Sequence, residues 1–340
     1  MRYTFLLIVL IISCAKSVPK APFNSVEIKT LYTDSLSVRA IELMGNSLAF
    51  AANNGTFGTV DLTTGKVRAN VEKYHTSIPA FRAVAHTSTD FFMLSIESPA
   101  LLYKTGEAGR MEMVYKEEGE GVFYDAMTFL NDKDGIAIGD SVNGCLSIII
   151  TSDGGKTWSK LPCSQLPDGI EGEGAFAASN TNIETLDDNI WVATTSGRIL
   201  FSSDKGKSWE VFKTPMKNTE PTEGIYSIDF FNENLGFAIG GDYTKPDDSY
   251  ANKAITKDGG KTWDLIADGK EPGYKSCVQF VPGSNGTGLV ALGFTGISYS
   301  SDMGATWKEL SKESFYTLRF KNDSVAYAAG KNRISKLTFK

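Results

Sequence analysis

The chain has 340 residues, with 34 basic and 40 acidic side chains, a formal net charge of −6 and 41% hydrophobic residues. No run of Lys or Arg occurs, and this excludes nucleic acid as a partner, because binding to its phosphates needs clustered positive charge. The 33 glycines suit an all-β protein with many short strands and tight turns, a class in which single domains often exceed 200 residues.

The first residues have the pattern of a targeting segment. Arg2 precedes an apolar run over residues 5–12, which is too short to cross a bilayer as a helix. The next residues, ending in Ser13-Cys14, resemble a bacterial lipobox. We therefore expect a lipoprotein-type signal peptide over 1–13, a lipidated Cys14 and a tether over 14–24, which makes the protein an exported cell-envelope lipoprotein on the periplasmic or outer-surface side. The alternative is an ordinary secretory signal with an incidental cysteine.

An eight-residue motif, [S/T]-x-D-x-G-x-[S/T]-W, occurs four times, at 151–158, 202–209, 256–263 and 300–307. Its aspartates are 51, 54 and 44 residues apart, the period of successive four-stranded propeller blades. The carboxylate and hydroxyls can bond turn N–H groups, the glycine allows a positive φ, and the Trp can pack on the adjacent sheet. One carboxylate per turn is too few ligands for Ca²⁺. We expect structural roles for Asp153, Gly155, Trp158, Asp204, Gly206, Trp209, Asp258, Gly260, Trp263, Asp302, Gly304 and Trp307.

Degenerate copies of the motif extend the blade count. Gly65 and Gly109 lie one blade period apart upstream of the intact copies, so six turns are recognisable. Three further strand-like runs follow at 315–320, 325–329 and 334–339, and residues 26–31 remain to supply a fourth strand. The sequence therefore predicts a single all-β domain over 25–340, a seven-bladed β-propeller with four-stranded blades, closed by the N-terminal strand against the C-terminal blade. We expect it to be a monomer.

Three cysteines follow Cys14 in the chain. If the first motif turn centres between Gly154 and Gly155, residues whose numbers sum to about 309 face each other across its hairpin. Cys145 and Cys163 meet this condition within one residue, and an exported protein can form a disulfide there. Two free thiols are the alternative.

Superposing the blade starts predicts a ring of side chains around the central channel. The aligned positions are Arg39, Arg82, Asp125, Ala177, Ser227, Cys277 and Thr317. Two arginines in neighbouring blades can hold an anion, such as a carboxylate of a peptide or sugar, through bidentate contacts. In the alternative, Asp125 pairs with Arg82 or Arg39 and fills the channel.

Several loops at the end of the propeller opposite the motif turns are long, and long loops on rigid scaffolds often carry binding residues. They span 139–144, 162–174, 213–224 and 240–252, and their acidic residues suit a cationic or hydroxyl-rich ligand or a basic protein surface. Solvated acidic loops are the alternative. The full set of candidate binding residues at this channel mouth is Arg39, Arg82, Asp125, Asp140, Glu171, Glu173, Ser227, Asp242, Tyr243 and Thr317.

The repeated motif resembles the Asp-box of the BNR repeat, which occurs in sialidases, sortilin-like receptors and the photosystem II stability/assembly factor group. The chain resembles exported bacterial relatives of that last group through most of 35–340, on segments 37–39, 97–105, 124–127, 135–140, 172–179 and 236–243. The resemblance implies a protein-binding platform that assists assembly of a membrane complex. The sequence itself offers no catalytic residues, no dinucleotide, haem or flavin motif for a cofactor, and no metal-ligand spacing around its two histidines, so an enzyme is not the expected interpretation. The identity of a client does not follow, because repeats specify the scaffold and not the cargo.

A glycan-binding protein or a sialidase-like glycoside hydrolase is the alternative function. Arg39, Arg82 and Arg198 are the arginines that such a hydrolase could use to hold a substrate carboxylate. The family's F/Y-R-I-P entry motif is absent, since its nearest copy reads Phe81-Arg82-Ala83-Val84. The expected partner is therefore a protein at an extracytoplasmic membrane surface, or a glycan.

Overall fold

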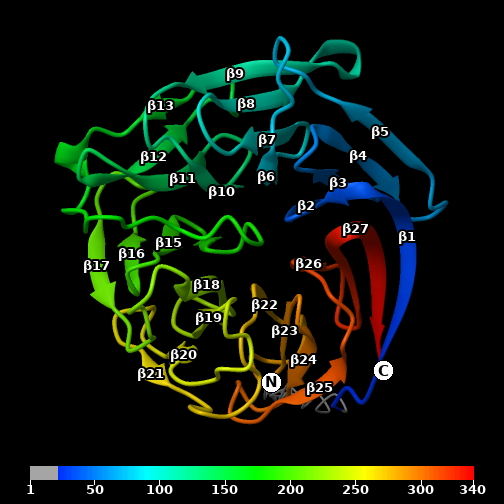
Figure 1. The fold of residues 1–340 in the computed structure, drawn as a ribbon, viewed down its shortest axis with the longest axis vertical. Helices are drawn as coiled ribbons and strands as arrows, with labels where there is room; N and C mark the ends of the chain where they lie inside the picture. Colours follow the sequence, from blue (N-terminus) through cyan, green and yellow to red (C-terminus); the bar gives the residue numbers. More distant parts are fainter. Residues whose placement is uncertain (1–21) are drawn as a thin grey trace, which may run out of the picture.

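The computed structural model describes residues 22–340, which form seven antiparallel β-sheets arranged as blades around a central channel (Figure 1). This confirms the seven-bladed propeller expected from the motif spacing. The signal peptide, Cys14 and most of the expected tether lie outside the described residues. Within residues 22–340, no helix combines the length and apolar character that crossing a bilayer requires.

Each of the first six blades is a meander of four strands, with the innermost strand first in sequence. The strands of blades one to three are β2 (Ala40–Met44), β3 (Ser47–Ala51), β4 (Thr56–Asp61), β5 (Val67–Val71), β6 (Phe81–His86), β7 (Phe91–Ser95), β8 (Ala100–Thr105), β9 (Met111–Glu117), β10 (Tyr124–Phe129), β11 (Gly135–Val142), β12 (Cys145–Thr151) and β13 (Ser159–Lys160). Those of blades four to six are β14 (Ile183–Leu186), β15 (Asn189–Ala193), β16 (Arg198–Ser202), β17 (Glu210–Lys213), β18 (Glu223–Phe230), β19 (Gly236–Asp242), β20 (Lys253–Thr256), β21 (Asp264–Leu265), β22 (Cys277–Phe280), β23 (Leu289–Gly293), β24 (Gly296–Ser300) and β25 (Lys308–Ser311). Two short 3₁₀ turns, η1 (Glu107–Gly109) and η2 (Cys163–Gln165), interrupt the connections.

Blade seven closes the ring with both ends of the chain. It contains β26 (Thr317–Phe320), the long strand β27 (Val325–Phe339) and the N-terminal strand β1 (Val26–Ser37). The first part of β27 pairs with β26, and the rest pairs with β1, so one long strand replaces the two runs expected at 325–329 and 334–339. Figure 1 shows β1 in blue along the outer edge of the red β27.

The four motif turns share one hydrogen-bond pattern. In the first, the Thr151 hydroxyl donates to Oδ1 of Asp153 at 2.8 Å and accepts the Gly155 N–H at 3.1 Å, while the Thr157 hydroxyl donates to Oδ2 of Asp153 at 2.7 Å. The other three turns repeat these bonds within 0.3 Å. In those three the Trp indole N–H also donates to the carbonyl of the turn glycine.

Apolar side chains are buried mainly between neighbouring blades. Seven clusters among the described residues each join one blade to the next around the ring. The motif tryptophans take part, since Trp158 packs against Phe92 of blade two and Trp263 packs in the cluster that contains Trp191 of blade four. The expected contact of the motif Trp with the adjacent sheet is therefore present.

The hairpin of β12 and β13 has the register expected around the first motif turn. Ile149 faces Lys160 and Ile150 faces Ser159, so the residue numbers sum to 309. Just beyond these pairs, Cys145 and Cys163 form a disulfide with their Cα atoms 5.6 Å apart. Cys277 is a buried free thiol.

Candidate binding site at the channel mouth

The central channel is closed by a segment of blade four. The alignment of Ala177 with the innermost strands of the other blades is wrong, because the innermost strand of blade four, β14, begins only at Ile183. Residues 175–182 instead enter the channel, where Figure 1 shows a green loop reaching toward the middle of the ring. We call these residues the channel segment.

The channel segment is bonded to most blades. The Asn180 side-chain amide donates to the carbonyls of Val84 and Met127 at 2.8 and 3.2 Å, and its oxygen accepts the Met127 N–H. The Ser179 hydroxyl donates to the carbonyl of Ser276 at 2.6 Å, and the Ser179 carbonyl accepts the Thr317 hydroxyl at 2.9 Å. These contacts reach blades two, three, six and seven, so the segment is a fixed floor rather than a free loop.

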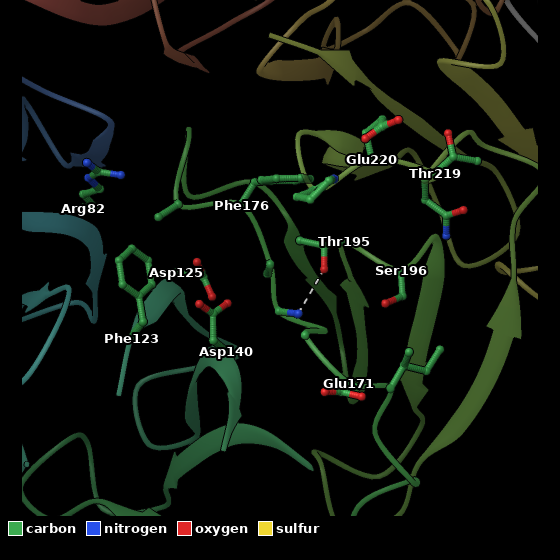
Figure 2. A pocket seen from close by; sticks show the side chains of 17 residues that line it. Arg82, Phe123, Asp125, Asp140, Glu171, Phe176, Thr195, Ser196, Thr219 and Glu220 are labelled. Carbon is green, nitrogen blue, oxygen red and sulfur yellow. Dashed lines mark hydrogen bonds between the residues drawn. The ribbon is translucent and has the colours of Figure 1, made fainter. Parts of the chain in front are cut away.

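Two cavities open on the mouth side of this floor. The larger, of about 780 Å³, lies over blades three and four (Figure 2). The smaller, of about 430 Å³, lies over blades one, two, five, six and seven. Their linings share Arg82, Phe176 and Ala177, so the two cavities are adjoining parts of one mouth.

β-Bulges direct three side chains into this mouth. In β6, β10 and β18 the pairing register shifts by one residue, which leaves Arg82, Asp125 and Tyr226 as the extra residues. A bulge re-aims the side chain of the extra residue. Tyr226, not the expected Ser227, is therefore the blade-five equivalent of Arg82 and Asp125.

Arg39 and Arg82 both line the smaller cavity, as expected for an anion site. The Arg39 guanidinium lies 4.4 Å from the ring centre of Tyr316 and donates to the Ala178 carbonyl at 3.5 Å. Nε of Arg82 is buried without a hydrogen-bond partner. Burial, and then the charge of Arg39, lower the pKa of Arg82. Neither arginine forms an ion pair with a carboxylate of the described residues, so Asp125 does not neutralise them by direct contact.

Aromatic rings form the wall beside the arginines. Phe176 stacks on Tyr226 with ring centres 3.7 Å apart, and Tyr274 packs edge-on against Tyr226 at 4.8 Å. Tyr243 and Phe294, which are 48% and 39% exposed, extend the wall to the surface. The smaller cavity thus combines two cations with apolar rings, which suits a carboxylate attached to an apolar group.

Two carboxyl groups face each other in the larger cavity (Figure 2). Asp125 is fully buried, and neither of its carboxyl oxygens has a well-formed hydrogen bond. Burial, and then the neighbouring Asp140, raise the pKa of Asp125 well above its usual range. Burial also raises the pKa of Asp140, to about 6, although the Ala175 N–H and Asp125 oppose this effect. The two carboxyl groups therefore keep a proton to a higher pH than isolated aspartates do.

The remaining candidate residues divide into exposed and structural positions. Glu171 lines the larger cavity and Tyr243 the smaller one. Glu173 is buried and paired with Arg198, whose Nε donates to it at 2.8 Å. Because Arg198 is held in this way and lines neither cavity, it does not join Arg39 and Arg82 in an arginine triad.

Three other candidates are buried in the scaffold and face neither cavity. The Ser227 hydroxyl accepts from the Thr181 hydroxyl and from the Val278 N–H, at 2.8 and 3.0 Å. Thr317 bonds the channel segment, as described above. Asp242 accepts the N–H and hydroxyl of Thr244 and so closes its own loop. The ring expected from the aligned blade starts is therefore only partly a binding surface.

Comparisons with known proteins support the propeller. A family model described as Sortilin-Vps10, "Sortilin, neurotensin receptor 3", matches residues 146–280. A solved structure described as YCF48 bound to D1 peptide is 14% identical, with a TM-score of 0.64 over 95% of this chain and 100% of that one. YCF48 from Cyanidioschyzon merolae is also 14% identical, with a TM-score of 0.61 over 93% and 98% of the two chains. The WD40 repeats of RRP9 are 13% identical, with a TM-score of 0.66 over 95% and 100%.

These likenesses agree with the expected relationship to the assembly-factor group at the level of the fold. No curated protein matches the chain. Within residues 22–340, no cluster of three or more His, Cys, Asp or Glu side chains is arranged to hold a metal ion.

Proposed function

We propose that the protein is an exported, lipid-anchored propeller that binds a partner protein at the channel mouth and serves as an assembly platform. The observation that carries this proposal is the placement of Arg39 and Arg82 in one cavity, beside aromatic rings and without an ion-paired carboxylate. A carboxylate of a partner peptide supplies the missing charge, and its apolar neighbours fit the aromatic wall. The fold likeness to a YCF48 structure with a bound peptide supports the same use of this scaffold.

The test is selection from a random peptide library displayed with free C-terminal carboxylates, followed by measurement of Kd for the selected peptides. We expect the double variant Arg39→Ala/Arg82→Ala to weaken binding at least tenfold, because a charge-assisted hydrogen bond contributes about 1.5–3 kcal/mol. Arg68→Ala/Arg110→Ala, which removes two exposed arginines elsewhere, is the matched control. Failure to select any peptide, or equal binding by both double variants, contradicts the proposal.

Lipid anchoring rests on the sequence before the described residues. Incorporation of a labelled fatty acid in a bacterial host, abolished by Cys14→Ser, is the expected result. Labelling that persists in Cys14→Ser contradicts this part of the proposal and leaves the peptide-binding part unaffected.

A further inference from the structure

The two cavities of the mouth differ in charge. The smaller one, which we call the arginine cavity, is lined by Arg39 and Arg82 and by no carboxylate of the described residues. The larger one, which we call the acid cavity, is lined by four carboxyl groups, and Arg82 at its border is its one cationic lining residue within residues 22–340. Those carboxyl groups belong to Asp125, Asp140, Glu171 and Glu220.

The acid cavity contains a buried carboxyl group whose hydrogen bonds to its neighbours are poorly formed. Asp125 is 0% exposed, lines the cavity, and has no well-formed hydrogen bond at either carboxyl oxygen. Burial of a polar group without good hydrogen bonds costs free energy. Such groups are uncommon unless a ligand or a water molecule supplies the hydrogen bonds. A ligand that donates hydrogen bonds to the Asp125 carboxyl oxygens would therefore stabilise this site.

The backbone around the pair leaves space for the two carboxyl groups. A Cβ at Gly174 would overlap Oδ1 of Asp140, so only glycine permits this approach. The Gly174 N–H donates to the Thr195 hydroxyl at 3.0 Å, and the Thr195 N–H donates to the Gly174 carbonyl at 2.9 Å. These bonds attach Gly174 to the turn between β15 and β16 of blade four, so the backbone beside Asp140 is held in place.

We propose that the acid cavity binds a lysine or arginine side chain of the same peptide whose carboxylate lies against Arg39 and Arg82. This inference rests on the proposed function and specifies its ligand as a peptide that carries both charges. A guanidinium or ammonium group supplies donors to the carboxyl oxygens of Asp125 and Asp140. The shared border at Arg82 and Phe176 allows one short segment to reach both cavities.

The pH dependence of binding distinguishes a bound cation from a bound anion at this pair of carboxyl groups. The charged groups that line the cavity with the pair are Arg82 from β6 and Glu171 and Glu220 from the loops. Arg39, before β2, and Glu97, after β7, act on Arg82. A bound cation favours the fully ionised pair, so binding releases a proton and the affinity rises with pH. A ligand anion held by the protonated pair would show the opposite dependence.

The first experiment uses a probe that needs no carboxylate site. N-acetyl-arginine amide and its uncharged analogue, N-acetyl-citrulline amide, are titrated into the protein and followed by NMR shifts. We expect the arginine probe to bind at least fivefold more tightly, with a preference that grows from pH 5 to pH 8. Asp125→Asn/Asp140→Asn, which keeps the shape of the protonated pair, abolishes the preference, whereas the exposed control Glu210→Gln/Asp264→Asn retains it.

The second experiment replaces Lys or Arg by norleucine or citrulline in the peptides selected above. We expect at least a tenfold loss for wild type and almost none for Asp125→Asn/Asp140→Asn, with thermal unfolding showing that the variant is folded. Peptides that bind through Arg39 and Arg82 without this preference overturn the inference and leave the proposed function standing. Arginine-probe binding without any selected peptide overturns the proposed function and leaves the acid cavity standing. A preference that falls with rising pH overturns the inference.

Discussion

Carboxyl groups of this protein show how strongly the neighbours of a residue decide its chemistry. Partial burial raises the pKa of Asp153, but the hydroxyl and N–H of Thr157 with further turn donors outweigh it and bring the pKa to about 2. Within residues 22–340, Asp125 has only the Ala175 N–H as such a donor and faces the carboxyl group of Asp140, and burial raises its pKa instead. An aspartate therefore stabilises a turn as a carboxylate in one place and stays protonated to higher pH in the other.

A second close pair of carboxyl groups, Glu184 and Asp229, lies on the neighbouring innermost strands β14 and β18. Burial raises the pKa of both groups, and the charge of Asp229 raises that of Glu184 further. Since the folded state holds these protons more tightly than the unfolded chain, their stabilising contribution is complete at acidic pH. This contribution decreases as the pH rises above the usual pKa range of carboxyl groups, and it is gone above the raised pKa values of Glu184 and Asp229.

Replacing Asp229 by Asn tests this linkage. We expect the free energy of unfolding of wild type to fall between pH 5 and pH 8.5, and the fall to be smaller in Asp229→Asn by about 2 kcal/mol. The Asn oxygen can still accept the Phe280 N–H, which Asp229 accepts at 2.6 Å. Urea unfolding at several pH values measures the difference, with the exposed Asp264→Asn as control. An unchanged pH dependence in Asp229→Asn contradicts the linkage.

The motif turns are the elements that sequence predicts best, because their bonds are local. Asp153 accepts the side-chain hydroxyls of Thr151 and Thr157 and the backbone N–H groups of Lys156 and Thr157. All these partners lie within four residues, so the pattern of eight residues contains the whole turn. Blade number and the β12–β13 register followed from the same local information.

We expect Asp153→Ala to lower the free energy of unfolding by about 2 kcal/mol, because several turn donors lose their acceptor at once. Ser152→Ala changes the exposed neighbour in the same turn, and its effect should stay within about 0.5 kcal/mol. Chemical unfolding of the two variants against wild type provides the comparison. Equal effects would mean that the turn bonds contribute little.

The channel segment was mispredicted because its partners are distant in sequence. Phe176-Ala-Ala has the apolar character of an innermost strand, but Asn180 bonds to Val84, 96 residues away. The long connection between β13 and β14 pointed to a functional role for this segment, because connections of this length without a strand are usually functional. Tyr226 was missed for a related reason, because a bulge shifts its strand by one residue and no local pattern marks the shift.

At the scale of the whole molecule, the N-terminal strand relates the channel mouth to the proposed anchor. β1 begins at the motif-turn end of the propeller, where Nζ of Lys308 donates to Asn24, and it ends near Arg39 at the mouth. Cys14 is eight positions before Pro22, a span of at most about 30 Å. A lipid at Cys14 would therefore be attached nearer to the motif turns than to the mouth, so anchoring leaves the mouth accessible to a partner.

The same strand closes the ring, and its removal is the sharpest test of the whole fold. Deleting residues 22–37 uncovers the outer edge of β27 and removes Phe23, Ile28 and Leu36 from the clusters between blades six, seven and one. We expect a loss of the cooperative unfolding transition and binding of an apolar dye, because an open propeller exposes a sheet edge and two unpaired apolar faces. Calorimetry and dye fluorescence measure these changes.

A synthetic peptide of residues 22–37, added to the truncated protein, should restore cooperative unfolding by pairing with β27 in the register of Val26 with Phe339. A scrambled peptide of the same composition is the control, since it keeps the charge and apolar content but places Ile28 and Leu36 out of register. Restoration by both peptides would reduce the role of β1 to nonspecific covering of apolar surface. A truncated protein that unfolds cooperatively without either peptide would show that six blades and the β26–β27 pair close the ring without β1.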